Sequence, residues 1–223
     1  MPTAIVTGAT RGLGRALAFD LARQGVTVYG TGLNHDRLDA LEVGDLPFHP
    51  VRADVSSEAS NAALAERVRG TGLDILVHNA GVLGSRVPLA HTRKDEFERV
   101  LAVNTTGVFD LTAKVAHLLN PGARLIFVSS GVGNQARANW GAYCVSKNAL
   151  EAIAGIYAKE LHDARVYVVD PGGMRTEMRA AAYPDEDPMT LVTPEQNLGV
   201  FRWLLAPDCM APSGSRHLAK DHR

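Results

Sequence analysis

The chain contains a tyrosine and a lysine four residues apart, Tyr143 and Lys147, and Ser130 lies thirteen residues before the tyrosine. On a helix, this spacing puts the tyrosine and lysine side chains on one face. A free tyrosine has a pKa of about 10, too high for efficient proton transfer near neutral pH. A lysine cation beside it favours the phenolate and lowers that pKa. With a serine hydroxyl to bind a substrate oxygen, the three groups could polarise a carbonyl and pass a proton to it.

A glycine-rich segment near the N-terminus indicates where the matching hydride donor would bind. The apolar run at 4–6 predicts a strand, followed by the sequence TGATRGLG at 7–14 and a helical pattern from 15 to 24. Strand, glycine-rich turn and helix in that order form the context of a dinucleotide-binding loop. The glycines let the backbone approach a pyrophosphate closely, and the helix N-terminus favours its negative charge. The alternative interpretation is a tight turn that binds nothing.

The rest of the chain alternates between strand-like and helix-like segments, which would position these residues. Continuous apolar strands separated by helices predict a parallel sheet covered on both faces. With right-handed crossovers, the result is a single-domain, doubly wound Rossmann fold of the α/β class spanning residues 1–223. Strands are predicted at 3–7, 26–31, 47–53, 75–78, 124–129 and 166–170, and helices at about 12–24, 36–42, 57–69, 93–119, 142–162 and 194–206.

Composition excludes several other classes of function. The 223 residues carry a formal net charge of −1, so no basic excess points to nucleic acid or to an anionic membrane surface. No apolar run approaches the roughly 20 residues that span a bilayer. Two cysteines without paired spacing are typical of a reducing compartment, and we expect a cytoplasmic protein. No HExxH or CxxC pattern occurs, so no metal site is expected.

The ordered motifs of the chain resemble those of the classical short-chain dehydrogenase/reductase family, from residue 3 to about residue 178. The family's TGxxxGxG pattern matches 7–14, and its Ser, Tyr and Lys match Ser130, Tyr143 and Lys147. The remaining matches are Asp54-Val55 after the third strand, the NAG motif at Asn79-Ala80-Gly81, the helix asparagine Asn104, and the PGxxxT segment from Pro171 to Thr176.

The resemblance implies a catalytic role for four residues. Tyr143 would be the general acid in carbonyl reduction and the base in alcohol oxidation, and Lys147 would also hold the nicotinamide ribose. Ser130 would bind the substrate oxygen, although the adjacent Ser129 competes for this role. Asn104 would anchor a water in a proton relay, while a surface position or a local helix kink is the alternative.

The resemblance also implies a set of cofactor-binding residues. Asp54 would contact adenine with Val55 as its neighbour, or else cap the helix that follows. Asn79 would brace the central strands, and Thr176 with the preceding backbone would hold the carboxamide or pyrophosphate end. The complete set is Gly8, Thr10, Arg11, Gly12, Leu13, Gly14, Asp54, Val55, Asn79, Ala80, Gly81, Tyr143, Lys147, Pro171, Gly172, Met174 and Thr176.

Charge near the second predicted strand bears on the choice of nucleotide. NAD-preferring enzymes usually place an acid at the end of that strand, where it binds the ribose 2′-hydroxyl. Here Gly32 and Leu33 occupy the position, and the first acid is Asp36. Arg11 matches an arginine that meets the 2′-phosphate in NADP-using relatives, whereas the usual second arginine is missing at Leu33-Asn34. We therefore expect NADP in preference to NAD, with NAD left open.

The sequence thus predicts an NAD(P)-dependent oxidoreductase that interconverts a carbonyl and an alcohol on a small molecule, with no nucleic-acid or membrane partner. A catalytically silent dinucleotide sensor and the longer dehydratase and epimerase branch are the alternatives. The resemblance implies a substrate lid at about 177–193 and a homodimer or homotetramer. In that assembly, apolar positions on two helices would face a partner: Leu111, Val115, Leu118, Leu150, Ile153 and Tyr157.

Overall fold

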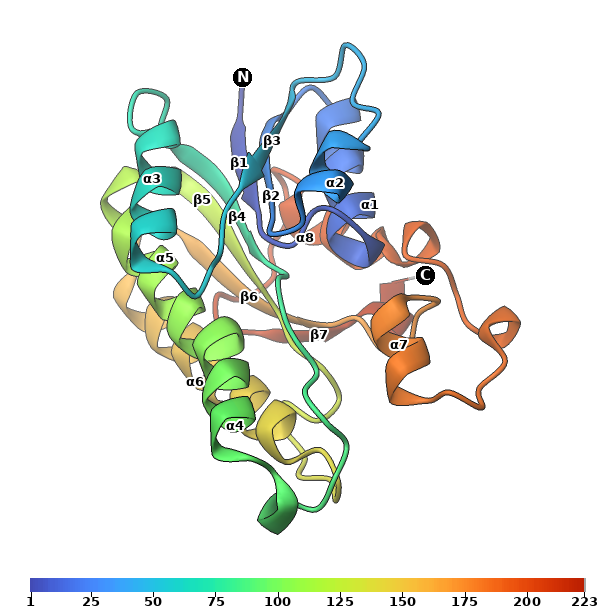
Figure 1. Ribbon diagram of the computed structural model, residues 1–223. Coiled ribbons are helices and arrows are strands. Elements are labelled where there is room, and N and C mark those ends of the chain that lie inside the picture. The colour runs from blue at the N-terminus through green and yellow to red at the C-terminus, as the bar shows by residue number, and fades with distance from the viewer. Residues whose placement is uncertain (223) are drawn as a thin grey trace.

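The computed structural model describes residues 1–222 and consists of one parallel sheet between two layers of helices (Figure 1). The strands are β1 (Thr3–Val6), β2 (Thr27–Gly32), β3 (Phe48–Arg52), β4 (Leu73–His78), β5 (Leu119–Val128), β6 (Arg165–Asp170) and β7 (Arg216–Leu218). Their order across the sheet is β3-β2-β1-β4-β5-β6-β7, and every neighbouring pair is parallel. The predicted doubly wound α/β fold is confirmed.

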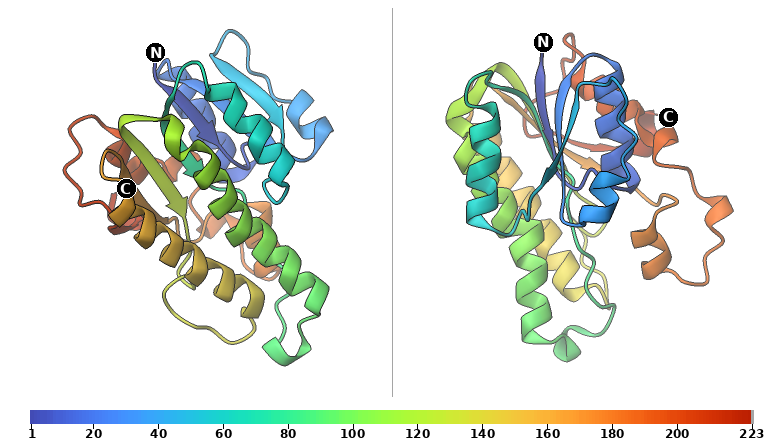
Figure 2. Two further views of the ribbon diagram at one scale, coloured as in Figure 1. Left: turned by 90° about the vertical axis from the view of Figure 1, so that its left-hand side faces the viewer. Right: turned by 45° about the horizontal axis from the view of Figure 1, so that its top comes forward.

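The helices cover both faces of this sheet, as the two views in Figure 2 show. They are α1 (Gly12–Arg23), α2 (His35–Asp39), α3 (Glu58–Val68), α4 (Lys94–Leu101), α5 (Gly107–Val115), α6 (Gly141–Glu160), α7 (Glu177–Ala182) and α8 (Gly199–Leu205). A π-helical turn at Ala102–Thr106 joins α4 to α5, and short 3₁₀ turns lie at 89–91, 116–118, 188–190, 195–197 and 219–222. No helix within the described part of the chain is long and apolar enough to cross a membrane.

Alternating side chains on the central strands create two separate cores. Ala4 and Val6 of β1 pack with α1 and α8, whereas Ile5 between them packs on the other face with α3, α5 and α6. Strand β5 repeats the pattern, with Ile126 in the first core and Phe127 in the second. Because successive strand residues point to opposite faces, a strand covered on both sides must be apolar throughout.

The strand order reverses between β1 and β4, and this reversal fixes where a ligand can bind. From β1 the chain proceeds outward through β2 to β3, and from β4 it proceeds the other way through β5 and β6. The loops after β1 and β4 therefore diverge at the carboxyl edge of the sheet, which is the switch point where open α/β sheets bind ligands. The glycine-rich segment follows β1 and the NAG motif follows β4, so the two meet there.

The structure differs from the predicted elements in three main places, of which the first is helix α7, which was not predicted. The last strand, β7, was not predicted because it spans only Arg216–Leu218 within a polar stretch. The single helix predicted at 93–119 is interrupted by the π-helical turn at Ala102–Thr106, and the residues from Leu119 belong to β5.

The predicted partner-facing residues need correction, because the phase of the two helices differs from the expectation. Leu111, Val115 and Leu150 are fully buried against the sheet, and Leu118, Ile153 and Tyr157 pack partly against the same core. The apolar side chains that α5 and α6 expose are Phe109, Val145 and Ile156. A partner surface on these helices would therefore be built from the latter three.

Candidate active site

A cleft of about 790 Å³ runs along the carboxyl edge of the sheet and brings together most of the predicted site residues. It extends from the adenosine end, beside the glycine-rich loop and β2, to the catalytic end beside α6. From the predicted set, the lining includes Gly8, Thr10, Arg11, Gly12, Leu13, Asp54, Val55, Asn79, Ala80, Gly81, Ser130, Tyr143, Lys147, Pro171, Gly172, Met174 and Thr176. Gly14 and Asn104 lie behind this lining.

The glycine-rich loop is packed so closely that it excludes side chains at two positions. A Cβ atom at Gly14 would lie 2.3 Å from both the Gly8 oxygen and the Asn79 Nδ2. Gly8 has a φ of +68°, and a Cβ atom there would lie 2.9 Å from the Ala80 Cα. Such a cradle of backbone beside a helix N-terminus fits a dinucleotide pyrophosphate.

Asn79 holds the two loops of the switch point together. Its side-chain amide donates hydrogen bonds to the backbone oxygens of Thr7 at 2.9 Å and Gly8 at 3.1 Å. In return, the Thr7 hydroxyl accepts hydrogen bonds from the backbone amides of Asn79 and Ala80, each at 3.0 Å. The bracing expected of Asn79 is thus present, and Thr7 belongs to the same unit although it was absent from the predicted set.

Asp54 lines the cleft and does not cap the following helix. Its Oδ1 accepts hydrogen bonds from the backbone amide and the hydroxyl of Ser56. Ser57 caps α3 instead, because its side chain accepts a hydrogen bond from the Ser60 amide. The capping interpretation is therefore wrong, and an adenine contact by Asp54 and Val55 stays a prediction.

Asn104 lies in the middle of the π-helical turn and is fully buried. Its side chain pairs with the backbone of Val82 in both directions at 2.9 Å and donates to the Ser146 hydroxyl at 3.0 Å. Surface exposure is excluded, and the two amide hydrogens of the side chain are both engaged; the role in a proton relay stays a prediction. In this turn, the Gly107 amide donates a hydrogen bond to the backbone oxygen of Ala102, five residues earlier. The helical hydrogen-bond pattern is therefore shifted by one residue.

Tyr143 and Lys147 project from one face of α6 into the catalytic end of the cleft. The Lys147 Nζ lies 5.7 Å from the centroid of the tyrosine ring and donates a 2.7 Å hydrogen bond to the Val128 oxygen. Ser130 forms a side-chain hydrogen bond with the tyrosine. The competing Ser129 is engaged with Glu151 instead. The geometry therefore favours Ser130 as the serine that meets a substrate.

Burial governs the protonation of this pair. It raises the pKa of Tyr143 to about 12; the hydrogen bond with Ser130 opposes the rise and the charge of Asp170 adds to it. Burial also lowers the pKa of Lys147 to about 8, against the opposing charge of Glu151. Lys147 is not among the causes of the Tyr143 shift, so the expected lowering of the tyrosine pKa by the lysine stays a prediction. The phenol keeps its proton throughout the physiological range.

A buried histidine lies behind the lysine. His78, at the end of β4, has its Nε2 2.7 Å from the Thr112 hydroxyl, which donates to the Val108 oxygen. Burial, and secondarily the charge of Lys147, lowers the pKa of His78 to about 3. The imidazole is therefore neutral at physiological pH, and its Nε2 donates to the threonine.

The last strand holds the backbone of Ser130, the predicted catalytic serine, and the sequence did not predict this contact. Arg216 of β7 donates to the Ser130 backbone oxygen at 3.0 Å and pairs with Asp170 at 3.1 Å and Glu151 at 3.2 Å. Through Glu151, the network reaches Ser129. One arginine thus ties together the ends of β5 and β6 and helix α6.

The PGxxxT segment forms the far wall of the cleft and leads into α7. Asn197 donates to the Pro171 oxygen at 2.7 Å, and the Gly172 amide donates to Asp170 at 2.9 Å. The Thr176 hydroxyl caps α7 by accepting from the Arg179 amide at 3.2 Å. The predicted lid at 177–193 contains α7 and a 3₁₀ turn that includes Met189. Its action as a lid stays a prediction.

The mouth of the cleft is enclosed by stacked aromatic and arginine side chains. The Arg86 guanidinium lies 4.6 Å from the centroids of both the Trp140 and Tyr183 rings. It also donates to the backbone oxygen of Ala182, the last residue of α7. The Trp140 ring is tilted against the ring of Tyr143, with 5.9 Å between ring centroids. A loop, the entrance to α6 and the lid therefore meet around the substrate end.

A second arginine is present at the adenosine end, contrary to the interpretation of the sequence. Arg37 of α2 lines the cleft and shares an ion-pair partner, Glu177, with Arg11. At the end of β2, a Cβ atom at Gly32 would lie 2.2 Å from the Thr10 Cγ2. No acid stands at this position, and a larger residue there would require the Thr10 side chain to move. Among the described residues, no group of three or more His, Cys, Asp or Glu side chains could hold a metal ion.

Comparison with known proteins agrees with this geometry. The family model for short chain dehydrogenases matches residues 2–187. The Escherichia coli oxidoreductase YciK is 37% identical over 222 residues, covering 94% of this chain and 88% of the relative. An NADPH-dependent pterin aldehyde reductase of Arabidopsis thaliana is 33% identical, covering 81% of this chain and 78% of the relative.

Solved structures give the same result. A short chain dehydrogenase from Shigella flexneri complexed with NADP superposes with a TM-score of 0.93 at 35% identity, covering 98% of this chain and 97% of that chain. The YciK structure has a TM-score of 0.92 at 36% identity, covering 98% and 95%. The chain belongs to the short-chain dehydrogenase/reductase family of NAD(P)-dependent oxidoreductases.

Proposed function

We propose that this protein is an NADP-dependent oxidoreductase that interconverts a carbonyl and an alcohol on a small molecule, with Tyr143 as the general acid and base. The observation that carries the proposal is the position of three side chains in one cleft. Tyr143 and Lys147 extend from one face of α6, and Ser130 hydrogen-bonds the tyrosine, all within the cleft that begins at the glycine-rich cradle.

The cofactor fits the residues at both ends of the cleft. The close packing at Gly8 and Gly14 leaves a backbone cradle for the pyrophosphate. Arg11 and Arg37 suit a 2′-phosphate, and Gly32 stands where an acid would favour a 2′-hydroxyl. The NADP bound to the Shigella relative and the NADPH dependence of the Arabidopsis relative support the same choice.

When bound, NADPH supplies a hydride to the substrate carbon, and the side chains manage the oxygen. Ser130 donates a hydrogen bond to the carbonyl oxygen and polarises it. Tyr143, protonated at physiological pH because it is buried, gives its proton to the same oxygen. The Lys147 ammonium stabilises the phenolate that results. In oxidation, the tyrosine takes the alcohol proton instead. Asn104 shapes the turn that would hold a relay water.

A turnover assay tests the proposal. Purified protein is mixed with NADPH and a panel of aldehydes and ketones, and oxidation of NADPH is followed by absorbance. Turnover that requires both nucleotide and carbonyl, and that Tyr143→Phe abolishes, supports the proposal. Tight nucleotide binding without turnover on any member of the panel would favour the silent sensor.

The location in the cell and the assembly of the protein are also proposals. We propose a cytoplasmic homodimer or homotetramer, in which the exposed Phe109, Val145 and Ile156 of α5 and α6 face a partner copy.

A further inference from the structure

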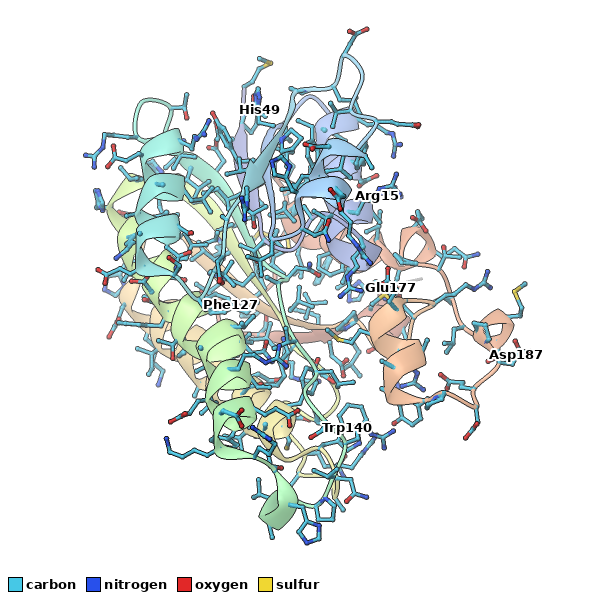
Figure 3. The ribbon with its side chains drawn as sticks, in the orientation of Figure 1. Arg15, His49, Phe127, Trp140, Glu177 and Asp187 are labelled. Carbon is cyan, nitrogen blue, oxygen red and sulfur yellow. The ribbon has the colours of Figure 1, made fainter. Side chains whose placement is uncertain are left out.

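A carboxylate from the lid occupies the two arginines at the adenosine end of the cleft. Arg37 of α2 pairs bidentately with Glu177, its Nη1 2.9 Å from Oε1 and its Nη2 3.1 Å from Oε2. Arg11 of the glycine-rich loop reaches the same Oε2. Glu177 is the first residue of α7, and Figure 3 shows it where α7 approaches the end of α1 that carries Arg15.

The three side chains surround a distinct part of the cleft. A smaller cavity of about 340 Å³ adjoins the main one and shares Arg11, Arg37 and Glu177 with it. It is lined by the glycine-rich loop, the start of α1 and the α2 segment that follows β2, the region that distinguishes a ribose 2′-hydroxyl from a 2′-phosphate in such folds. The carboxylate therefore accepts the hydrogen bonds that a phosphate at this point would accept.

The internal bracing of the lid does not depend on this contact, which instead attaches the first residue of α7 to Arg11 and Arg37. Thr176 caps the helix, and Arg179 is paired with Glu186 at 2.5 and 2.6 Å, which braces the lid internally. Glu177 and its arginine partners are about half exposed, so ion pairing there contributes little to stability. The contact does occupy both guanidinium groups that face the cleft and balances one of their two positive charges.

We propose that Glu177 is a built-in competitor for the 2′-phosphate of NADP(H), so that this lid residue sets the preference between NADP(H) and NAD(H). The proposal rests on the proposed use of NADP. A phosphate with up to two negative charges and three acceptor oxygens displaces a singly charged carboxylate from Arg11 and Arg37. Displacement frees the first turn of α7, whereas NAD(H), which lacks the phosphate, leaves the three-residue contact intact.

Calorimetric titration with NADPH and NADH tests the competition directly. In Glu177→Gln the arginines are released, and the variant should bind NADPH about three- to thirtyfold more tightly while NADH affinity changes less than about twofold. The fragments 2′,5′-ADP and 5′-AMP should reproduce the difference, because they carry only the adenosine end. Glu186→Gln is the matched control, since it removes an equal charge from the same lid away from Arg11.

Hydrogen exchange of α7 supplies a second measurement. In the wild type, 2′,5′-ADP should raise exchange at 177–182 and 5′-AMP should not; Glu177→Gln should show the raised exchange without ligand. Unchanged or weaker NADPH binding by Glu177→Gln, equal gains for both nucleotides, or the same gain in Glu186→Gln would overturn the competition. If Arg11→Ala still loses NADPH selectively, NADP use survives that failure; if no variant distinguishes the nucleotides, the cofactor proposal fails as well.

Discussion

The Lys147 ammonium lies 5.7 Å from the centre of the Tyr143 ring, close enough to stabilise a phenolate but not to hold the tyrosine ionised against burial. The resident form of the pair is a protonated phenol beside a lysine whose pKa is lowered to about 8. This arrangement favours Tyr143 as a proton donor, and the first prediction concerns its hydroxyl.

Tyr143→Phe keeps the ring and its packing but removes the proton. Turnover should fall by about 10²–10⁴-fold, the usual contribution of a general acid–base group, while NADPH affinity and the thermal midpoint stay near wild type. Lys147→Ala should lower turnover and weaken nucleotide binding together. Steady-state kinetics and calorimetry separate the two effects, and wild-type turnover by Tyr143→Phe would refute the mechanism.

The arginines at the adenosine end should determine nucleotide choice. Arg11→Ala removes one charge-assisted contact to the 2′-phosphate, so NADPH binding should weaken about ten- to a hundredfold with little effect on NADH. Arg37→Ala should act in the same direction. Calorimetric titration measures the affinities for both nucleotides. An equal loss of NADH affinity would mean that neither arginine binds the 2′-phosphate.

His78 makes stability depend on pH. Its folded pKa of about 3 lies below the unfolded value of 6.5, so its contribution is complete above pH 6.5 and is lost as the pH falls towards 3. Between pH 7.5 and 5.5, the contribution of His78 to the unfolding free energy should drop by about 1 kcal/mol, because its imidazole takes a proton only in the unfolded chain. Urea denaturation at both values measures this drop.

The His78→Gln variant should lose most of that pH dependence. The control variant His91→Gln should retain it, because His91 is exposed. A His78→Gln variant with an undiminished drop would show that other groups cause it.

Two glycines should respond oppositely to alanine. At Gly14 the new methyl group would lie 2.3 Å from the Gly8 oxygen, so Gly14→Ala should cost about 1–3 kcal/mol and weaken nucleotide binding. At Gly155, inside α6, a Cβ atom meets nothing within 4 Å, so Gly155→Ala should stabilise the chain by about 0.5–1 kcal/mol. Thermal denaturation distinguishes them, and equal shifts would contradict the packing argument.

The exposed apolar side chains of α5 and α6 should mark the subunit interface. Phe109 and Ile156 are 53% and 54% exposed. Introducing a charge by Phe109→Glu should shift a dimer or tetramer towards monomer in light scattering, whereas Trp203→Glu on α8 should not. A monomeric mass of the wild-type protein at micromolar concentration would refute the proposed homodimer or homotetramer.

The fold and the centre of the site could be predicted because their signals are local. Apolar strand runs, the glycine-rich turn and the four-residue spacing of Tyr143 and Lys147 each depend on neighbours in sequence. Contacts between distant segments could not be predicted in this way. Arg216 meets Ser130 only because β7 joins the sheet beside β6, and a three-residue strand carries almost no pattern.

Two further features could not be predicted: which face of each helix packs on the sheet, and which residues α7 contacts. Leu111 and Leu150 are apolar at helical spacing, but which apolar stripe faces the sheet is decided by packing, and both proved to be buried. Arg37 lies beyond the position where a second arginine was sought, and only the approach of α7 reveals that it faces the same carboxylate as Arg11.

The hydrogen bonds from Asn79 to Thr7 and Gly8 have a consequence for how a ligand is received. They join the two halves of the sheet at its centre, so the part of the protein that grips the nucleotide and the part that carries Tyr143 form one preorganised body. In the proposed function, the distance over which a hydride travels is then set when the chain folds rather than when the ligand binds. The predicted lid that begins at α7 would be the part that adapts to substrates of different shape without disturbing that distance.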